Sequence, residues 1–265
     1  MSAPTRTFQR FTRGRRLLRF AVYLLSLAAV VVSLRTVAII PEFLADAPHQ
    51  MLDLLTRMWP PDAGHYAKGV HQALIETLHV ATLGTLGTVF LAVPTALLAT
   101  RRIVPWRILN RLAQLILVSS RSVNTLVWAL LCVAVFGPGA VAGTVAIALR
   151  SIGFVGKLLS EALAETDTGP IEALRAIGAP WPSVLAKGYW PQVQPAFWGI
   201  ILFRWDINVR ESAVLGLVGA GGIGMALDTA LNLFYWDRVS LILATIFAVV
   251  VLMELLVTVI RRRIL

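Results

Sequence analysis

Four arginines that lie inside long apolar runs are the residues of this sequence with the clearest chemical potential: Arg121, Arg150, Arg204 and Arg210. A charge at the centre of a membrane helix costs roughly 2.5 to 3.5 kcal/mol on insertion scales, so these side chains are not expected to face lipid. One interpretation is structural, with each guanidinium paired to an acid or reaching to the membrane surface. The other is a cavity for an anionic solute, because the guanidinium offers a fork of donors that suits oxyanions.

Helical spacing places further polar residues beside these arginines. Arg121, Asn124, Thr125 and Trp128 follow the pattern i, i+3, i+4, i+7, which predicts one polar stripe along a single helix. A later run predicts a second stripe, formed by Arg204, Asn208 and Glu211.

The four arginines differ in their access to a neutralising acid. Asp206 and Arg210 are four residues apart and can neutralise each other on a different face of their helix. Arg121 and Arg150 have no acid within helical reach, so they are the better candidates for anion binding. The full set of candidate cavity residues is Arg121, Asn124, Arg150, Asn208, Arg210 and Glu211.

Other chemistry finds little support in the residue pattern. The run Gly219–Gly224 has the spacing Gly-x-Gly-x-x-Gly, but we reject a dinucleotide site because no βαβ unit surrounds it. The four histidines form no His-Glu-x-x-His set, and no nucleophile elbow or catalytic carboxylate pair is present. Cys132 is the single cysteine, which excludes a disulfide framework within the chain. We therefore predict no catalytic residue, no metal site and no cofactor bound by this chain.

The composition indicates which solvent surrounds the chain. Hydrophobic residues make up 57% and charged residues 14% of the sequence, and the mean hydropathy is +0.76. These values are typical of an integral membrane protein and not of a soluble domain. The net charge of +10 would suggest nucleic acid as the partner of a soluble chain. Here membrane orientation explains the charge, so we predict lipid contact and no nucleic-acid partner.

Hydropathy predicts an all-α chain with about six transmembrane helices. A basic segment without acids precedes the first apolar run, as in a signal peptide, but no clear cleavage site follows and we predict a retained span. We expect a basic amino-terminal arm at 1–19, a first helix and outer loop at 20–73, and a core at 74–265. The expected spans are residues 20–40, 74–100, 112–136, 140–163, 193–218 and 239–260.

The basic residues predict the orientation of these spans. Threading six spans alternately places the amino-terminal arm, the loop at 101–111, the segment at 157–187 and Arg261–Arg263 on one face. The opposite face carries only Arg35, Arg57, Lys68 and Arg238. Because cytoplasmic loops retain Lys and Arg, we expect both termini in the cytoplasm.

One hydrophilic segment, at 167–191, interrupts the apolar carboxyl-terminal half. Asp167 or Thr168 can cap a helix there and Gly178 can end it. We expect Ser183 to cap a second short helix that stops before Pro191. The segment is either a simple loop with a capped helix or a docking element for a cytoplasmic partner.

Two stretches resemble a known family. Glu172-Ala173, then Gly178, then Pro191 follow the order of the EAA loop in permeases of bacterial ABC importers. The runs at 151–157 and 207–224 are similar to permeases of the phosphonate ABC importer family, and the resemblance extends from about Thr77 to the end. Arg121-Ser122-Val123-Asn124 departs from the more apolar, proline-containing stretch expected there.

This resemblance implies a type I importer permease in the bacterial inner membrane. The expected partners are a cytoplasmic ABC ATPase dimer that binds ATP and Mg²⁺, a second permease subunit, identical or a close paralogue, and an extracytoplasmic binding protein. The candidate cavity residues then line a pathway for phosphonate, phosphate or a related oxyanion. The implied ATPase-coupling residues are Glu172, Ala173, Arg175, Gly178 and Pro191. The alternatives are an importer of the same fold for another small solute, such as an amino acid, and a membrane-embedded enzyme.

Overall fold

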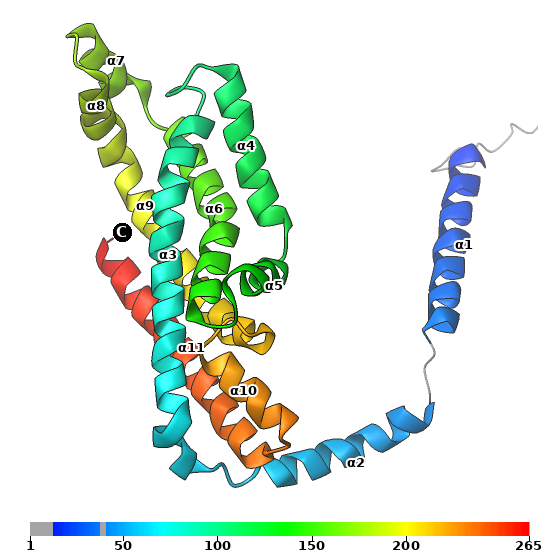
Figure 1. Cartoon of the computed structure of the whole chain (residues 1–265). Helices are drawn as coiled ribbons and strands as arrows, with labels where there is room; N and C mark the ends of the chain where they lie inside the picture. Colours follow the sequence, from blue (N-terminus) through cyan, green and yellow to red (C-terminus); the bar gives the residue numbers. More distant parts are fainter. Residues whose placement is uncertain (1–12, 38–40, 265) are drawn as a thin grey trace, which may run out of the picture. The chain divides into compact units, whose positions relative to one another are not determined.

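The computed structural model describes residues 13–37 and 41–264, which form helices joined by short turns (Figure 1). The chain divides into two compact units, Met1–Leu55 and Thr56–Leu265. Within the described residues, five helices are long and apolar enough to cross a membrane, or six if one sharply bent pair counts as a single span. The prediction of an all-α membrane protein is confirmed.

The amino-terminal unit holds α1 (Arg13–Thr36) and most of α2 (Pro41–Met58). α1 is apolar on every side from Phe20 to Val32, which is typical of a membrane span. Pro41 occupies the first turn of α2, where its missing N–H group leaves no helical bond unmade. Most of the predicted basic arm, residues 1–12, lies outside the described residues.

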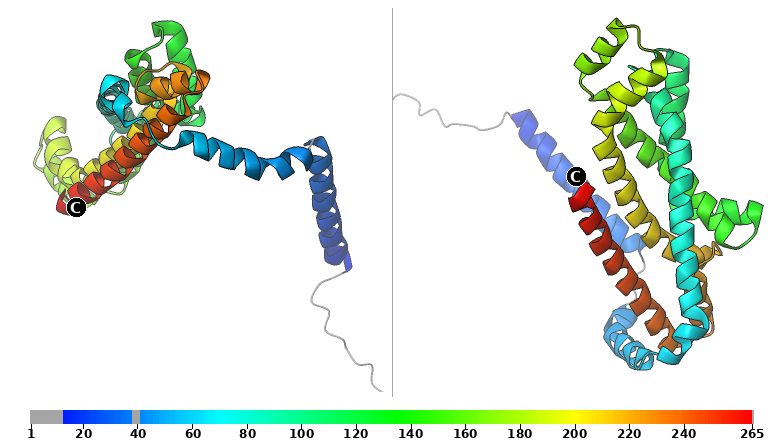
Figure 2. Two further views of the ribbon diagram at one scale, coloured as in Figure 1. Left: turned by 90° about the horizontal axis from the view of Figure 1, so that it is seen from below. Right: turned by 90° about the vertical axis from the view of Figure 1, so that its left-hand side faces the viewer.

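The second unit is a bundle built on α3 (His71–Ala99), α6 (Ala140–Ala164), α9 (Trp190–Leu215) and α11 (Trp236–Ile264) (Figures 1 and 2). Buried small residues, including Ala81, Ala92 and Ala146, line the contacts of α3 and α6. Small side chains let two helix backbones approach closely, which favours helix association in lipid. The bundle thus brings α3, α6 and α9 together around a shared interior.

The predicted third span is not one continuous helix. It is divided into α4 (Arg107–Ser122) and α5 (Thr125–Phe136), whose axes differ by 96°. Val123 and Asn124 between them have extended backbones, and the Asn124 side chain accepts a hydrogen bond from the N–H group of Leu126 at 3.0 Å. Asn is a favoured N-cap residue, so a new helix starts here instead of the old one continuing. The single polar stripe predicted from Arg121 to Trp128 is therefore wrong.

The second half of the 167–191 segment also differs from the prediction. After α7 (Thr168–Ala176), the helical backbone restarts as α8 (Trp181–Val184), continues through a π-helical turn (Leu185–Tyr189) and runs directly into α9. Ser183 lies within α8 and does not cap it. Pro191 does not stop the helix, because it falls in the first turn of α9, where the wider π turn precedes it.

Short helices complete the second unit. Residues Ala63–His65 and Tyr66–Val70 lead into α3, Gly216–Val218 follows α9, and α10 (Ile223–Asn232) precedes α11. Residues 219–222 of the glycine run form the turn before α10, and no strand precedes them in the described part of the chain. In Figure 1, α7 and α8 lie at one end of the bundle and α10 lies toward the other.

Candidate functional site

A buried polar network lies between α3, α6 and α9. Asn208 is fully buried on α9 and donates from Nδ2 to Thr85 Oγ1 of α3 at 2.8 Å. Ser151 Oγ on α6 donates to Asn208 Oδ1 at 3.1 Å. One amide therefore joins three helices, so α9 cannot slide along α3 or α6 without breaking these bonds.

An ion pair between buried Arg204 and partly buried Glu211 extends this network to the broken helix. Arg204, 3% exposed, donates from Nη2 to Glu211 Oε2 at 3.0 Å and from Nε to Ser151 Oγ at 2.8 Å. Thr125, the first residue of α5, donates to the same Glu211 oxygen at 3.1 Å. The Arg204 guanidinium also lies 5.7 Å from the ring centre of Phe154. Glu211 thus neutralises Arg204 and ties α5 to α9.

The pair that the sequence predicted, Asp206 with Arg210, is present. Arg210 Nη2 donates to Asp206 Oδ2, four residues earlier on α9. Asp206 is buried and its other carboxylate oxygen accepts no hydrogen bond from the described residues, whereas the Arg210 side chain is 46% exposed. Asp206 neutralises the charge of Arg210, which makes Arg210 a weaker candidate for binding an anion.

Arg150 and Arg121 are left without an acid among the described residues. Arg150 on α6 has a buried Nε atom with no hydrogen-bond partner, and its charge acts on that of Arg204 nearby. Arg121 lies in the last turn of α4 and is exposed, and its backbone lies against Gly153 of α6 so closely that any Cβ at Gly153 would collide with it. This close approach holds the end of α4 near the α6 turn that carries Arg150.

The predicted cavity residues therefore divide into two groups. Asn208 and Glu211 meet in the buried network, which also contains Thr85, Ser151 and Thr125. The sequence pattern did not predict Thr85 and Ser151 as site residues. Their hydroxyl groups, which interrupt apolar runs, were the feature that could have indicated them. The other group comprises Arg210, paired on another face of α9, Arg121 and Arg150, which are unpaired, and Asn124, which caps α5.

The other candidate site is the helix α7 and the turn that follows it. The Asp167 side chain accepts a hydrogen bond from the N–H group of Gly169 at 3.1 Å and caps the helix. Gly178 has a φ of +74°, and its N–H group donates to Arg175 O at 3.0 Å. Ala179 N donates to Leu174 O at 3.0 Å. These bonds form the glycine-dependent helix end that the sequence predicted.

α7 is anchored on one side and free on the other. Ile171, 3% exposed, packs in a cluster with Val184 and Tyr189. The Gln192 side chain accepts a hydrogen bond from Asp167 N at 2.8 Å and donates to Gly188 O at 2.8 Å. The outer face carries the exposed side chains of Glu172, Ala173 and Arg175, and none of these forms an ion pair within the described residues.

The described residues contain no group of three or more His, Cys, Asp or Glu side chains that could hold a metal ion. Cys132 is free and buried in α5. Within the described residues, Arg204 and Arg210 are each paired with one carboxylate, and Arg204 also donates to the Ser151 hydroxyl. This arrangement can orient an anion and contains no paired acid and base for catalysis.

Comparisons with known proteins agree with this architecture. A family model described as "Binding-protein-dependent transport system inner membrane component" matches residues 92–265. The phosphate-import permease protein PhnE of Mycolicibacterium smegmatis is 38% identical over 234 residues, which are 88% of this chain and 44% of that protein. The phosphite transport system permease protein PtxC of Stutzerimonas stutzeri is 37% identical over 203 residues, 77% of this chain and 74% of that protein.

Solved structures support the fold independently. An inward-facing MetNI methionine ABC transporter has a chain that superposes with a TM-score of 0.64 and 23% identity, covering 74% of this chain and 96% of that one. At this identity the likeness establishes the fold alone, which is that of a type I ABC importer permease.

Proposed function

We propose, because this chain belongs to the family of binding-protein-dependent transport system inner membrane components, that it forms the membrane pathway of an ATP-driven importer for phosphonate, phosphate or a related oxyanion. Proteins of this family are multi-pass inner-membrane transport subunits and not enzymes. Two of its relatives, 37 and 38% identical, are named as permeases for phosphate and phosphite. The observation that carries the proposal is the excess of unneutralised arginine in the bundle.

The charge balance of the interior favours an anionic solute. Arg204 and Arg210 are each neutralised by one carboxylate, whereas Arg150 and Arg121 have none among the described residues. The guanidinium group presents parallel donors that match two oxygens of a tetrahedral oxyanion. Arg150, with a buried and unpartnered Nε atom, is then the principal ligand during passage.

The family supplies the general partners, an ATPase and a binding protein. The finer arrangement is part of the proposal: two permease subunits, identical or paralogous, and an ATPase dimer that holds ATP and Mg²⁺. Glu172, Ala173 and Arg175 on the free face of α7 contact the ATPase, while Gly178 fixes the direction of the chain. Pro191, exposed at the start of α9, lies where that contact passes to the span.

Replacing Arg150 or Arg121 by Gln is expected to lower oxyanion uptake while the ATPase stays bound. The loss of one charge-assisted hydrogen bond to the solute corresponds to about 1.5 to 3 kcal/mol, or roughly a tenfold to hundredfold loss of uptake. Lys in the same positions should restore uptake only in part, because it keeps the charge without the fork. Uptake of labelled phosphonate, phosphate and phosphite by cells that carry each variant measures the effect.

The outcome also separates the proposal from its nearest rival. An importer of the same fold for an amino acid would take up none of the three oxyanions. Normal oxyanion uptake by both Gln variants would show that Arg121 and Arg150 have structural roles only.

The proposed orientation places both termini and α7 in the cytoplasm. In a Cys132→Ser background, a single cysteine at Asp62 should react with an impermeant thiol reagent from outside. A cysteine at Ala179 should react only after the membrane is opened. External labelling at Ala179 would overturn the orientation.

A further inference from the structure

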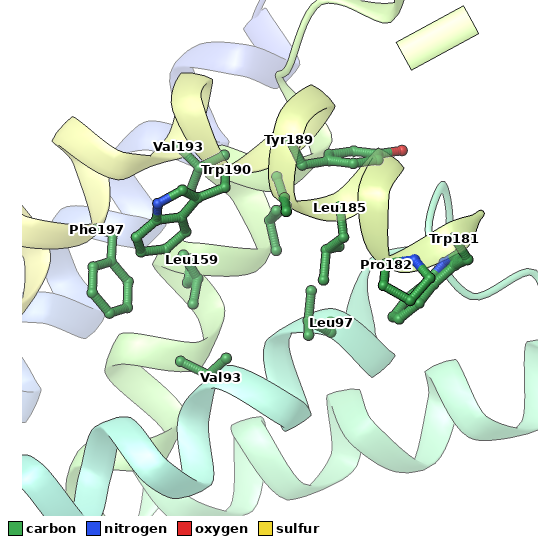
Figure 3. Close-up of a pocket in the computed structure, with 12 residues that line it drawn as sticks. Val93, Leu97, Leu159, Trp181, Pro182, Leu185, Tyr189, Trp190, Val193 and Phe197 are labelled. Atoms are coloured by element: carbon green, nitrogen blue, oxygen red, sulfur yellow. The ribbon is translucent and has the colours of Figure 1, made fainter. Parts of the chain in front are cut away.

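An apolar cavity of about 320 Å³ lies between the start of α9 and the ends of α3 and α6 (Figure 3). Val93 and Leu97 of α3 and Leu159 of α6 face it from one side, and Tyr189, Trp190 and Phe197 face it from the other (Figure 3). The remaining lining residues are Leu163, Trp181, Pro182, Leu185, Ala186 and Val193. The volume falls within the range of small-molecule binding pockets.

The position of the cavity determines which ligands reach it. Leu97 lies about 3 Å along the helix axis from Ala99, the last residue of α3, and the charged residue Arg101 follows two positions later. Trp181 and Trp190 at the cavity are 55% and 41% exposed. Trp is enriched where a bilayer meets water, because one part of its ring system is apolar and the other donates a hydrogen bond. The cavity therefore lies just inside the membrane surface, on the face proposed to be cytoplasmic.

The lining excludes a polar solute and suits a hydrocarbon chain. Apart from the Tyr189 hydroxyl and the two indole N–H groups, the lining side chains carry no polar atom. An oxyanion or a nucleotide would lose its hydrating water there and gain no hydrogen bonds that replace it, which is strongly unfavourable. A hydrocarbon chain gains roughly 0.8 kcal/mol for each methylene that it buries.

One exposed cation belongs to the helical turn Leu185–Tyr189, which supplies part of the lining. Lys187 directly follows the lining residue Ala186, is exposed, and forms no ion pair among the described residues. An ammonium group at this depth attracts the anionic headgroups of a cytoplasmic leaflet. Arg102, in the nearby loop after α3, donates instead to Thr166 O at 3.1 Å.

We propose that this cavity binds one acyl chain of an anionic phospholipid whose headgroup pairs with Lys187. This inference rests on the orientation given in the proposed function. The cavity wall at Leu185–Tyr189 is also the surface on which α7 packs, because Gly188 is in close contact with Ile171 and Leu174. The bound acyl chain packs between this wall and the helices α3 and α6, and so stiffens the connection from α7 to the spans.

The test uses the purified permease with its ATPase partner, stripped of lipid in detergent and titrated with phosphatidylglycerol or phosphatidylcholine. Native mass spectrometry should count one retained phosphatidylglycerol per permease subunit. Ala186→Trp fills the cavity and should weaken retention at least about tenfold, the effect of losing two buried methylenes. Lys187→Gln should remove the preference for phosphatidylglycerol over phosphatidylcholine.

Leu255→Trp is the matched control, because Leu255 is exposed on α11 and lies outside the cavity. This variant should retain lipid as the unmodified protein does. Equal retention by Ala186→Trp and the unmodified chain would overturn the proposal. Crosslinking of an Ala186→Cys variant to the ATPase or to a second permease, and not to lipid, would also overturn it by showing that protein covers the cavity. Lipid retention is measured without any transported solute. A negative lipid result therefore contradicts the lipid site alone, and a negative uptake result contradicts the transported solute alone.

Discussion

The Glu211→Leu variant is expected to lose most of the folded permease from the membrane. Arg204 is 3% exposed, and its Nη2 atom donates to Glu211 Oε2 at 3.0 Å. Removing Glu211 leaves a buried guanidinium with the Ser151 hydroxyl as its remaining hydrogen-bond partner. Breaking one side of a buried ion pair costs about 3 to 5 kcal/mol, a large fraction of the stability of a domain. Membrane abundance and the melting temperature of the purified chain measure this loss.

A double variant separates the charge effect from a packing effect. Arg204→Met together with Glu211→Leu removes both charges and fills the space with apolar atoms, which is often neutral or stabilising for a buried pair. We expect this variant to recover most of the folded protein, while α5 loses the bond from Thr125. Folding of Glu211→Leu to the level of the unmodified chain would show that Arg204 finds another partner.

The sequence was sufficient to predict most of the long helices and one ion pair within them. Long apolar runs predicted the spans that correspond to α3, α6, α9 and α11. The i, i+4 spacing predicted the contact between Asp206 and Arg210, because such a contact is set by one helix alone. The Asp167 cap and the positive φ of Gly178 were predictable for the same reason, since both depend on local backbone geometry.

The break between α4 and α5 was harder to predict because two local preferences compete there. Helical periodicity continued through Asn124, and the apolar run was long enough for one span. The N-cap preference of Asn124 prevailed, with Thr125 held by Glu211 from a distant part of the chain. Contacts across a sequence separation of 86 residues cannot be read from spacing on one helix.

Between α8 and α9 the error was the reverse: a helix stop was predicted, and the helical backbone is continuous. The sequence predicts a helix stop at Pro191, because proline lacks an N–H group and its ring collides with the preceding turn. A π-helical turn at 185–189 widens the backbone just before it, and the helix continues. The α7 segment is consequently joined to α9 by continuous helical backbone from Trp181 onward, a more rigid connection than the predicted short helix that stops before Pro191.

That rigid connection makes Gly178→Val and Glu172→Lys the variants with the largest expected effect on coupling. Gly178 has a φ of +74°, which a β-branched residue adopts only with strain, so Val should redirect the chain that leads to Trp181. No atom lies within 4 Å of a Cβ placed at Gly178, so backbone strain and not a clash is the cause of the effect. Lys at position 172 removes a free carboxylate from the exposed face of α7 and puts a positive charge in its place.

Both variants should reach the membrane in normal amounts, because α7 lies outside the spans and its anchor Ile171 is unchanged. We expect little ATPase on pull-down and almost no ATP hydrolysis stimulated by the binding protein in proteoliposomes. The loss of one charge-assisted contact by Glu172→Lys, about 1.5 to 3 kcal/mol, would weaken ATPase binding roughly tenfold to hundredfold. The charge reversal Asp62→Lys, on the opposite face in the proposed orientation, is the control and should keep ATPase recovery intact. Full stimulated hydrolysis by both Gly178→Val and Glu172→Lys would show that α7 does not couple the permease to its ATPase.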